Sequence, residues 1–303
     1  SDKDVRVEYE VKNGMYHGKY NSWYTNGKKK SHGEFSNNIR VGTWTVWDSN
    51  GTVRCVRKYK NNFEYERIFP KVSNEGPIPL LSEPSCKLER TSGGYYKYFY
   101  LKERAVAASK RIWRYIPAKN CNATLGSDFL YHKLIDSLLA GRIKVYDALN
   151  DELKQILDST RIHSMADTVG RKIVGYKIKE DWFFCKDRML SETRVVSICP
   201  IVHTKISPED SVELGWFYYP QLRNTLAAIP AQKGVYPEYV HSLEDVIWFR
   251  CFSSSIYRES NFTHKTLKES FGDPLGRAYK MEQTRIEIGL VEDEHDLWMR
   301  FSR

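Results

Sequence analysis

Residues 18–27, with the sequence GKYNSWYTNG, and residues 42–51, with the sequence GTWTVWDSNG, decide the fold of the first part of this chain. A shift of 24 positions (42 minus 18) superimposes a glycine, two aromatic residues and a closing Asn-Gly pair in the two stretches. The intervening segments VKNG (11–14), FSNN (35–38) and YKNN (59–62) share one register as well. Self-similarity at a fixed period indicates an array of identical supersecondary units.

Each unit is predicted to be a β-hairpin. Asn26-Gly27 and Asn50-Gly51 favour type I′ turns, because both central residues of such a turn take positive φ. Residues 43–47 alternate polar with apolar side chains, as half-buried strands do. Stacked hairpins of this kind predict an elongated, single-layer sheet over residues 1–66, with its aromatic face buried by neighbouring structure. The pattern resembles MORN-type repeats.

The sequence changes character after this module. Residues 67–97 contain four prolines, which exclude a helix or a central strand, so we expect a semi-extended linker. Residues 98–303 predict an α+β domain with a small antiparallel sheet and several helices. The expected helices cover residues 103–116, 127–140, 243–257 and 274–290, the last beginning with Pro274 at its first position. The expected strands cover residues 172–184, 194–202 and 214–219.

Composition excludes several classes of protein. The net charge is +9, but positive and negative residues are mixed along the chain, and the single basic run (28–30) lies beside a turn; we therefore expect no nucleic-acid partner. No stretch approaches the roughly 18 consecutive apolar residues of a membrane span. The first residues lack the apolar core of a signal peptide, which predicts a cytosolic chain or a mature form without its targeting segment. The six widely spaced cysteines permit disulfides but form no dense framework.

The sequence contains none of the common catalytic and cofactor motifs GxGxxG, GxxxxGK[ST], GxSxG and HExxH. The most site-like group is Glu294-His295-Asp296, where a histidine between carboxylates would suit proton transfer or metal binding. The simpler interpretation is a charged helix end or tail.

Two further candidates for chemistry also have simpler interpretations. Cys185 beside Lys186 is interpreted as a half-buried strand cysteine and not as an activated thiolate. Glu180 and Asp181 are neighbours in an expected strand, so they point to opposite faces and cannot form a glycosidase pair. We therefore predict no enzymatic activity, no cofactor and no metal site.

Six segments, in order along the second part of the chain, resemble the GldN/PorN family. They are residues 109–116 (SKRIWRYI), 177–184 (KIKEDWFF), 194–200 (RVVSICP), 214–220 (LGWFYYP), 252–261 (FSSSIYRESN) and 294–298 (EHDLW). The resemblance implies a non-enzymatic periplasmic ring subunit of the type IX secretion system of Bacteroidota, which often also serves gliding motility. It implies a removed signal peptide and a position at the inner face of the outer membrane, without a membrane span. The implied partners are a GldK/PorK outer-membrane lipoprotein, a GldM/PorM motor subunit and further copies of the chain.

The usual family pattern does not begin with hairpin repeats, which leaves alternatives open. The repeats act as a spacer, or they make the chain a binding module or specialised paralogue that recognises another protein, a glycan or lipid headgroups. An enzyme would instead need a deep pocket around residues 294–296 or Cys185.

A scaffold would concentrate its binding energy in a few aromatic and arginine residues. The candidates for partner binding lie in or beside the family-like segments and are Trp182, Trp216, Tyr218, Tyr219, Arg223 and Arg258. Because side chains alternate along a strand, about half of each aromatic run is expected to face the core.

Overall fold

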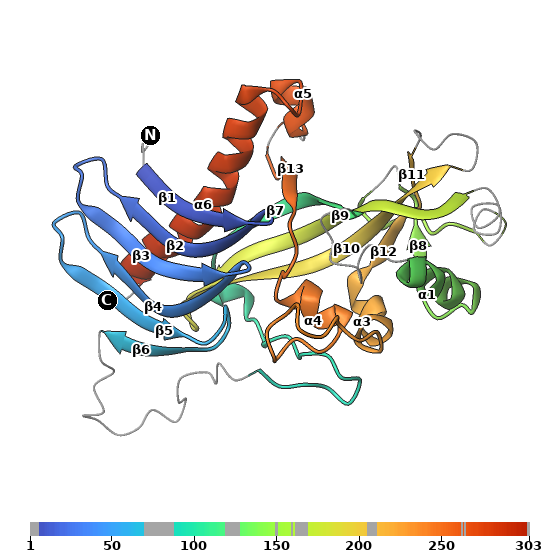
Figure 1. The fold of residues 1–303 in the computed structure, drawn as a ribbon, viewed down its shortest axis with the longest axis horizontal. Coiled ribbons are helices and arrows are strands. Elements are labelled where there is room, and N and C mark those ends of the chain that lie inside the picture. The colour runs from blue at the N-terminus through green and yellow to red at the C-terminus, as the bar shows by residue number, and fades with distance from the viewer. Residues whose placement is uncertain are drawn as a thin grey trace.

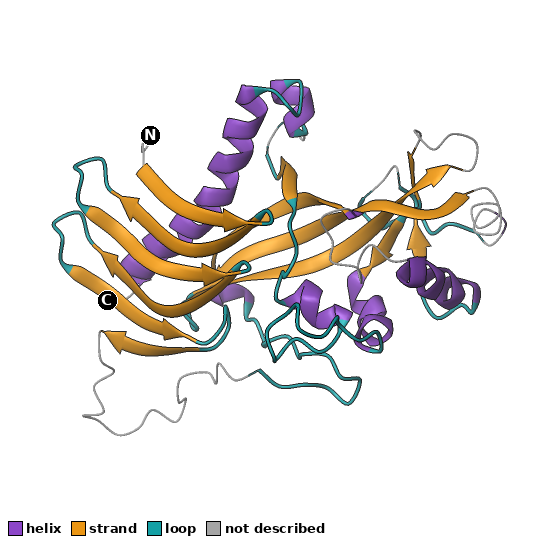
Figure 2. Cartoon of the chain, in the orientation of Figure 1, coloured by secondary structure: helices purple, strands orange, loops and turns teal. Residues whose placement is uncertain are grey.

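The computed structural model describes residues 6–69, 88–118, 128–148, 151–158, 160, 169–204, 211–261, 263 and 265–301. Two antiparallel sheets form its framework, and the helices lie around them (Figure 2). The expected α+β class is confirmed: a six-stranded hairpin sheet comes first, and a second antiparallel sheet with several helices follows.

The first sheet contains six strands in sequence order, each antiparallel to the next (Figure 1). They are β1 (Arg6–Lys12), β2 (Met15–Trp23), β3 (Lys29–Ser36), β4 (Ile39–Trp47), β5 (Val53–Tyr59) and β6 (Tyr65–Phe69). Along β4, Trp44 and Val46 are buried whereas Thr43 is exposed, as the alternation predicts. This arrangement is consistent with a MORN-like module of stacked hairpins.

The turns of this sheet correct one expectation. Asn13-Gly14 and Asn37-Asn38 have positive φ at both residues, which is the requirement of a type I′ turn. At Asn26-Gly27 and Asn50-Gly51 only the glycine has positive φ, so the type I′ prediction was wrong there. These two loops are longer: the amide of Tyr24 donates to the carbonyl of Lys28, and one left-handed glycine completes the turn.

The second sheet has the strand order β13-β7-β9-β10-β12-β8, with β11 paired to β10. Its strands are β7 (Val106–Pro117), β8 (Val145–Tyr146), β9 (Val169–Cys185), β10 (Leu190–Thr204), β11 (Ser211–Glu213), β12 (Trp216–Tyr218) and β13 (Ser255–Glu259). The strands expected at 172–184 and 194–202 are confirmed as the central pair β9 and β10. The strand expected at 214–219 is present but shorter, because a helix begins at Tyr219.

The described helices are α1 (Asp128–Leu139), α3 (Tyr219–Ala227), α4 (Leu243–Trp248), α5 (Leu267–Phe271) and α6 (Arg277–Phe301). Helix α1 confirms the helix expected at 127–140. Helix α3 was not expected: Pro220 lies in its first turn, where a missing N–H costs nothing, so this proline starts a helix as well as ending a strand.

Three expected helices need correction. Residues 103–116 were expected to be helical, but only the turn η1 (Glu103–Ala105) is, and β7 follows and pairs with β9. Partners distant in sequence decide this segment, because its aromatic and β-branched residues suit a pleated surface. The helix expected at 243–257 ends at Trp248, and β13 then pairs with β7. The last helix begins at Arg277, not Pro274, and continues to Phe301.

The two sheets share a hydrophobic core through α6, which passes behind the first sheet in Figure 1. Trp44 and Tyr20 of the hairpin sheet pack in one cluster with Trp298 of α6 and with Trp182 of β9. A second cluster joins Ile39 and Phe63 of the hairpin sheet to the helices α3 and α4. The apolar face of the hairpin sheet is therefore covered by the part of the chain that follows it.

The expected linker lies only partly within the described residues, since residues 70–87 fall outside them. Residues 67–69 belong to β6, and residues 88–97 form a turn closed by the bridge between Arg90 and Tyr96. Tyr96 packs against Phe249, and Arg90 forms an ion pair of 2.9 Å with Asp245. This segment is anchored to α4.

Candidate functional site

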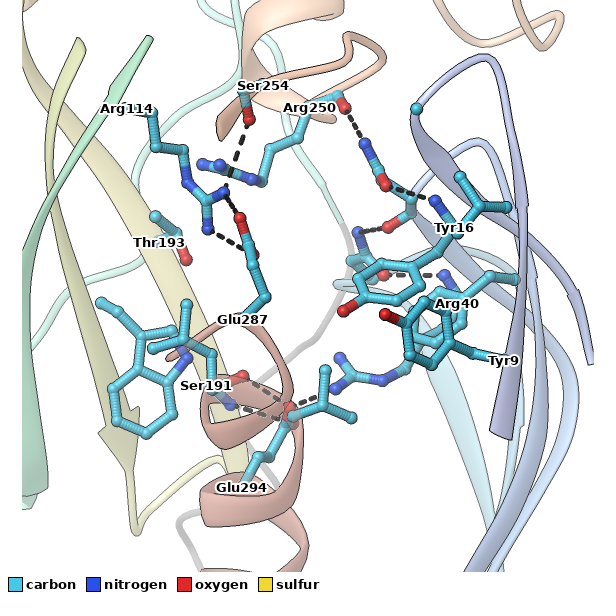
Figure 3. Close-up of a pocket in the computed structure, with 18 of the residues that line it drawn as sticks. Tyr9, Tyr16, Arg40, Arg114, Ser191, Thr193, Arg250, Ser254, Glu287 and Glu294 are labelled. Carbon is cyan, nitrogen blue, oxygen red and sulfur yellow. Dashed lines mark hydrogen bonds and ion pairs between the residues drawn. The ribbon is translucent and has the colours of Figure 1, made fainter. Parts of the chain in front are cut away.

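A cleft of about 280 Å³ lies between the hairpin sheet, the strands β7, β9 and β10, helix α6 and residues 248–255. Figure 3 shows Tyr9, Tyr16 and Arg40 on the hairpin side facing Arg114, Thr193 and Glu287 on the other side. The cleft exists only because the two sheets are folded against each other.

Two turns of the hairpin sheet are bound to the residues on the opposite side of this cleft. The side-chain amide of Asn38 donates to the carbonyls of Arg250 (3.1 Å) and Phe252 (3.0 Å), and its oxygen accepts from the amide of Tyr16 (2.9 Å). Gly14 approaches Ser253 so closely that a Cβ there would lie 2.1 Å from Ser253 Oγ. Only glycine fits at this contact, and its φ of 73° also suits glycine.

One wall of the cleft is a network of buried ion pairs. Arg114 binds Glu287 (Nη2 to Oε2, 3.0 Å) and lies 3.4 Å from Glu180, which also receives two hydrogen bonds from Arg250 (2.8 and 3.1 Å). Burial opposes the charge of Arg114, but Glu287 and Glu180 outweigh it and raise the pKa of its guanidinium. Arg250 has a φ of 60°, which is uncommon for a residue with a long side chain, so its surrounding contacts must hold the backbone in this conformation.

At the floor of the cleft Glu294 joins three parts of the structure. Its carboxylate is fully buried and accepts hydrogen bonds from Arg40 of β4 (2.5 Å) and from the hydroxyl of Ser191 of β10 (2.6 Å). Such a carboxylate would be costly to bury alone, so both donors are needed.

The group Glu294-His295-Asp296 lies in the last turns of α6, at the charged helix end that the simpler interpretation expected. This end is packed against the hairpin sheet, and His295 is fully buried among Tyr20, Trp44 and Trp298. The sequence did not indicate this burial, because it depends on the distant strands that cover this part of the helix.

A second ion-pair group involves Glu292 and Asp296, which flank Glu294 by two residues on either side in α6. Lys30 is buried and binds Glu292 (2.8 Å) and Asp296 (2.9 Å), while the hydroxyl of Tyr20 donates to Glu292 (2.8 Å). Burial alone would raise the pKa of Glu292, but its contacts with His295 and Lys30 lower that pKa well below its usual value. The hairpin sheet and α6 are thus joined by charges as well as by aromatic packing.

The six residues expected to bind partners are distributed unevenly. Trp182, Trp216, Tyr219 and Arg223 are buried inside this chain. Trp182 is part of the lining of the cleft, and Arg223 pairs with Glu244 (2.7 Å) among aromatic rings. Tyr218 has 38% of its surface exposed and Arg258 is half-buried, so these two side chains reach the surface.

Sequence reasoning missed most of the cleft. Tyr9, Tyr16, Arg40, Arg114 and Arg250 come from four separate strands and a loop, and no motif connects them. The glycine and asparagines of the two tight turns were visible as turn residues, but not as the contacts that fix the opposite wall. The prediction that Glu180 and Asp181 point to opposite faces is confirmed: Glu180 binds the buried arginines, and Asp181 binds Arg111 (2.6 Å) on the other face.

Within the described residues, no group of three His, Cys, Asp or Glu side chains is arranged to hold a metal ion. Cys185 is buried, as are Cys55, Cys199 and Cys251, and each of these four has a free thiol. The other two cysteines lie outside the described part of the chain. No described helix is both long enough and apolar enough to cross a membrane.

Comparison with protein families identifies the family to which the second part of the chain is similar. The model of the family described as "Gliding motility associated protein GldN" matches residues 101–299, from the segment before β7 into the last turn of α6. The chain belongs to the GldN family. It is thus a component of type IX secretion and gliding motility. Members of this family are periplasmic structural components and are not known as enzymes. A comparison with curated proteins gave no match.

The family match gives the cleft a particular setting. One wall, including Arg114, Arg250 and Glu287, belongs to the matched residues 101–299, and the other wall, including Tyr9 and Tyr16, belongs to the preceding hairpin sheet. The cleft therefore lies between the GldN-family part of the chain and the sheet that precedes it.

Proposed function

We propose that this chain is a non-enzymatic structural subunit of the periplasmic ring of the type IX secretion system. In this role it assembles with further copies of itself and with a GldK/PorK-like outer-membrane lipoprotein, and it contacts a GldM/PorM-like motor subunit. It stays at the inner face of the outer membrane as a peripheral protein. The family match over residues 101–299 is the observation that carries this proposal.

An exposed apolar corner supports a contact role. Helix α5 and the start of α6 project away from the two sheets in Figure 1. At this corner Leu275 has 78% and Met281 has 60% of its surface exposed, and Phe271 is also exposed. Apolar side chains gathered at a projecting corner are typical of protein contact surfaces.

Two positively charged side chains lie beside these apolar residues. Arg277 and Lys280 flank Met281 in a shallow surface depression of the first turns of α6. An apolar centre with arginine at its margin is the composition that interface cores and rims favour. We propose this corner as the main contact surface, with Tyr218 and Arg258 as further contacts.

Co-purification tests the proposal. The full chain is expressed with tagged GldK/PorK-like lipoprotein, or with the periplasmic part of a GldM/PorM-like subunit, from the same bacterium. The full chain should recover both partners, whereas the Leu275→Asp/Met281→Asp variant should lose at least one. Val235→Asp, an exposed position elsewhere in the described chain, is the matched control. If the full chain recovers neither partner, the ring role is overturned.

Use of the full chain matters here. A version without the hairpin sheet would uncover the aromatic cluster around Trp298, and its failure to bind would report misfolding. Surface variants avoid this ambiguity, because substitutions at exposed sites away from buried features usually change stability by no more than about 0.5 kcal/mol.

A further inference from the structure

We propose that the cleft between the hairpin sheet and the GldN-family part binds one unit of a neutral saccharide. This proposal goes beyond the ring role and does not rest on it. The argument comes from three properties of the cleft, which are its charge balance, its aromatic wall and its size.

The charges that line the cleft cancel. Its lining contains three arginines, Arg40, Arg114 and Arg250, and three glutamates, Glu192, Glu287 and Glu294. Each of these arginines is paired with a carboxylate, so no net positive charge is left to attract a phosphate or a carboxylate ligand. An apolar ligand is equally unsuited, because it would remove water from these ion pairs without replacing its hydrogen bonds.

Paired guanidinium and carboxylate groups instead present donors and acceptors side by side. A sugar hydroxyl both donates and accepts, so neighbouring hydroxyls match such pairs without changing their charge. Arg40 Nε is buried and has no hydrogen-bond partner among the described residues. Glu287, whose side chain has 22% of its surface exposed, supplies a carboxylate acceptor in the same cleft (Figure 3).

The opposite wall is aromatic. The rings of Tyr9 and Tyr16 lie edge to face with their centroids 5.2 Å apart, and Phe35 stacks on Tyr16 at 5.2 Å. A pyranose has an apolar face of C–H groups that packs on such rings, while its rim of hydroxyls faces the ion pairs. Among the described residues the hydroxyl of Tyr16 has no hydrogen-bond partner, so it is available to a ligand.

The size agrees with one sugar unit. The volume of 280 Å³ lies just below the range of about 300–1,000 Å³ that is usual for pockets of drug-sized ligands, so the cleft can hold one sugar unit but not a whole oligosaccharide. The site is a cleft and not a closed cavity, so the remaining units of a longer saccharide extend into solvent.

An array of neutral hexasaccharides of glucose, galactose, mannose and N-acetylglucosamine tests the proposal, with heparin hexasaccharide as the anionic probe and an extended neutral decapeptide as the peptide probe. Binding of the full chain is followed by calorimetry and by intrinsic tryptophan fluorescence, to which Trp182 and Trp248 in the lining of the cleft contribute. We expect at least one neutral hexasaccharide to bind, and Tyr9→Ala to weaken it about three- to tenfold. Tyr100→Ala removes a tyrosine elsewhere that has 84% of its surface exposed, and it should leave the affinity unchanged.

Thermal unfolding of both variants establishes that they are folded, and Tyr16→Phe provides a second variant that keeps the ring and removes only the hydroxyl. Binding of none of the neutral hexasaccharides would overturn the proposal, as would binding of only the heparin or the peptide probe. Equal affinity of Tyr9→Ala and Tyr100→Ala would also overturn it. Tyr9→Ala should still co-purify the secretion partners, so failure of this proposal is distinguishable from failure of the ring role.

Discussion

The ion pair between Arg40 and Glu294 allows a quantitative test of how the hairpin sheet is held to the rest of the chain. Both side chains are more than nine-tenths buried, and their closest atoms are 2.5 Å apart. In Arg40→Met the aliphatic part of the side chain is retained, but Glu294 keeps only the hydroxyl and amide of Ser191 as donors. Removing one partner of a buried pair typically costs about 3–5 kcal/mol. We expect about 3 kcal/mol here, because Ser191 remains.

Glu294→Gln should cost a similar amount, since it leaves the buried guanidinium of Arg40 without a counter-charge. The double variant removes both charges, so it should be more stable than the sum of the two single effects by about 2 kcal/mol, within the usual range of coupling energies of 0.5–3 kcal/mol. Urea unfolding, followed by tryptophan fluorescence and by far-UV circular dichroism, measures all four proteins. With a slope of about 3 kcal/mol/M, each single variant should lower the midpoint by about 1 M.

The exposed pair Arg6 and Glu8 provides the matched control, and its variants Arg6→Met and Glu8→Gln should each cost less than about 1 kcal/mol. Losses below 1 kcal/mol in both buried variants, or additive effects in the double variant, would refute the reasoning. So would two separate unfolding transitions in the unmodified chain, because a shared core requires the hairpin sheet and α6 to unfold together.

Three further predictions concern the same junction. A Cβ at Gly33 would lie 2.0 Å from the ring of Trp44, so Gly33→Ala should destabilise the chain by about 1–3 kcal/mol. A Cβ at Gly289 on α6 would meet no atom, so Gly289→Ala should stabilise the chain by about 0.5–1 kcal/mol. Urea unfolding measures both changes. The pKa of Glu292 is lower in the folded chain than in the unfolded chain, so its contribution to stability is complete above its unfolded pKa near 4.3 and is lost as the pH falls below that value. Glu292→Gln should therefore flatten the fall in stability between pH 5 and about pH 3. An unchanged slope of stability against pH would contradict this assignment. Asn38→Gly keeps the backbone conformation but removes the side-chain hydrogen bonds to the carbonyls of residues 250 and 252 and the one accepted from the amide of Tyr16. Hydrogen exchange should therefore rise at residues 13–16 and 250–254, and no rise would argue against the docking of this turn.

The sequence predicted those features that depend on local pattern. The 24-residue shift identified the hairpin sheet, and the runs of Ile, Val and aromatic residues identified β9 and β10. Residues 103–116 were misassigned because pairing with a strand more than 60 residues away (Ile112 with Glu180, 180 minus 112) decides their conformation. Local propensity carries no record of such a partner.

The candidate site was less predictable than the fold for the same physical reason. Arginine and glutamate side chains usually face solvent, and nothing in a single segment indicates that Arg40 and Glu294 lie within hydrogen-bond distance. Conversely, Trp216 and Tyr219 look like contact residues in an aromatic run but fill the core. Distinguishing the two kinds of residue requires knowledge of which faces α6 and the helices α3 and α4 cover.

The shared core also has a consequence for biogenesis. Tyr20 and Glu292 are in contact although they are 272 positions apart, so the hairpin sheet is synthesised well before the helix α6 that covers it. Until then the aromatic face around Trp44 is open to solvent and to other chains, which makes the growing polypeptide prone to aggregation. A chaperone that holds the nascent hairpin sheet would act during this interval, and a stop codon just before α6 would extend it indefinitely. Premature termination should therefore produce insoluble protein and not a shorter soluble subunit.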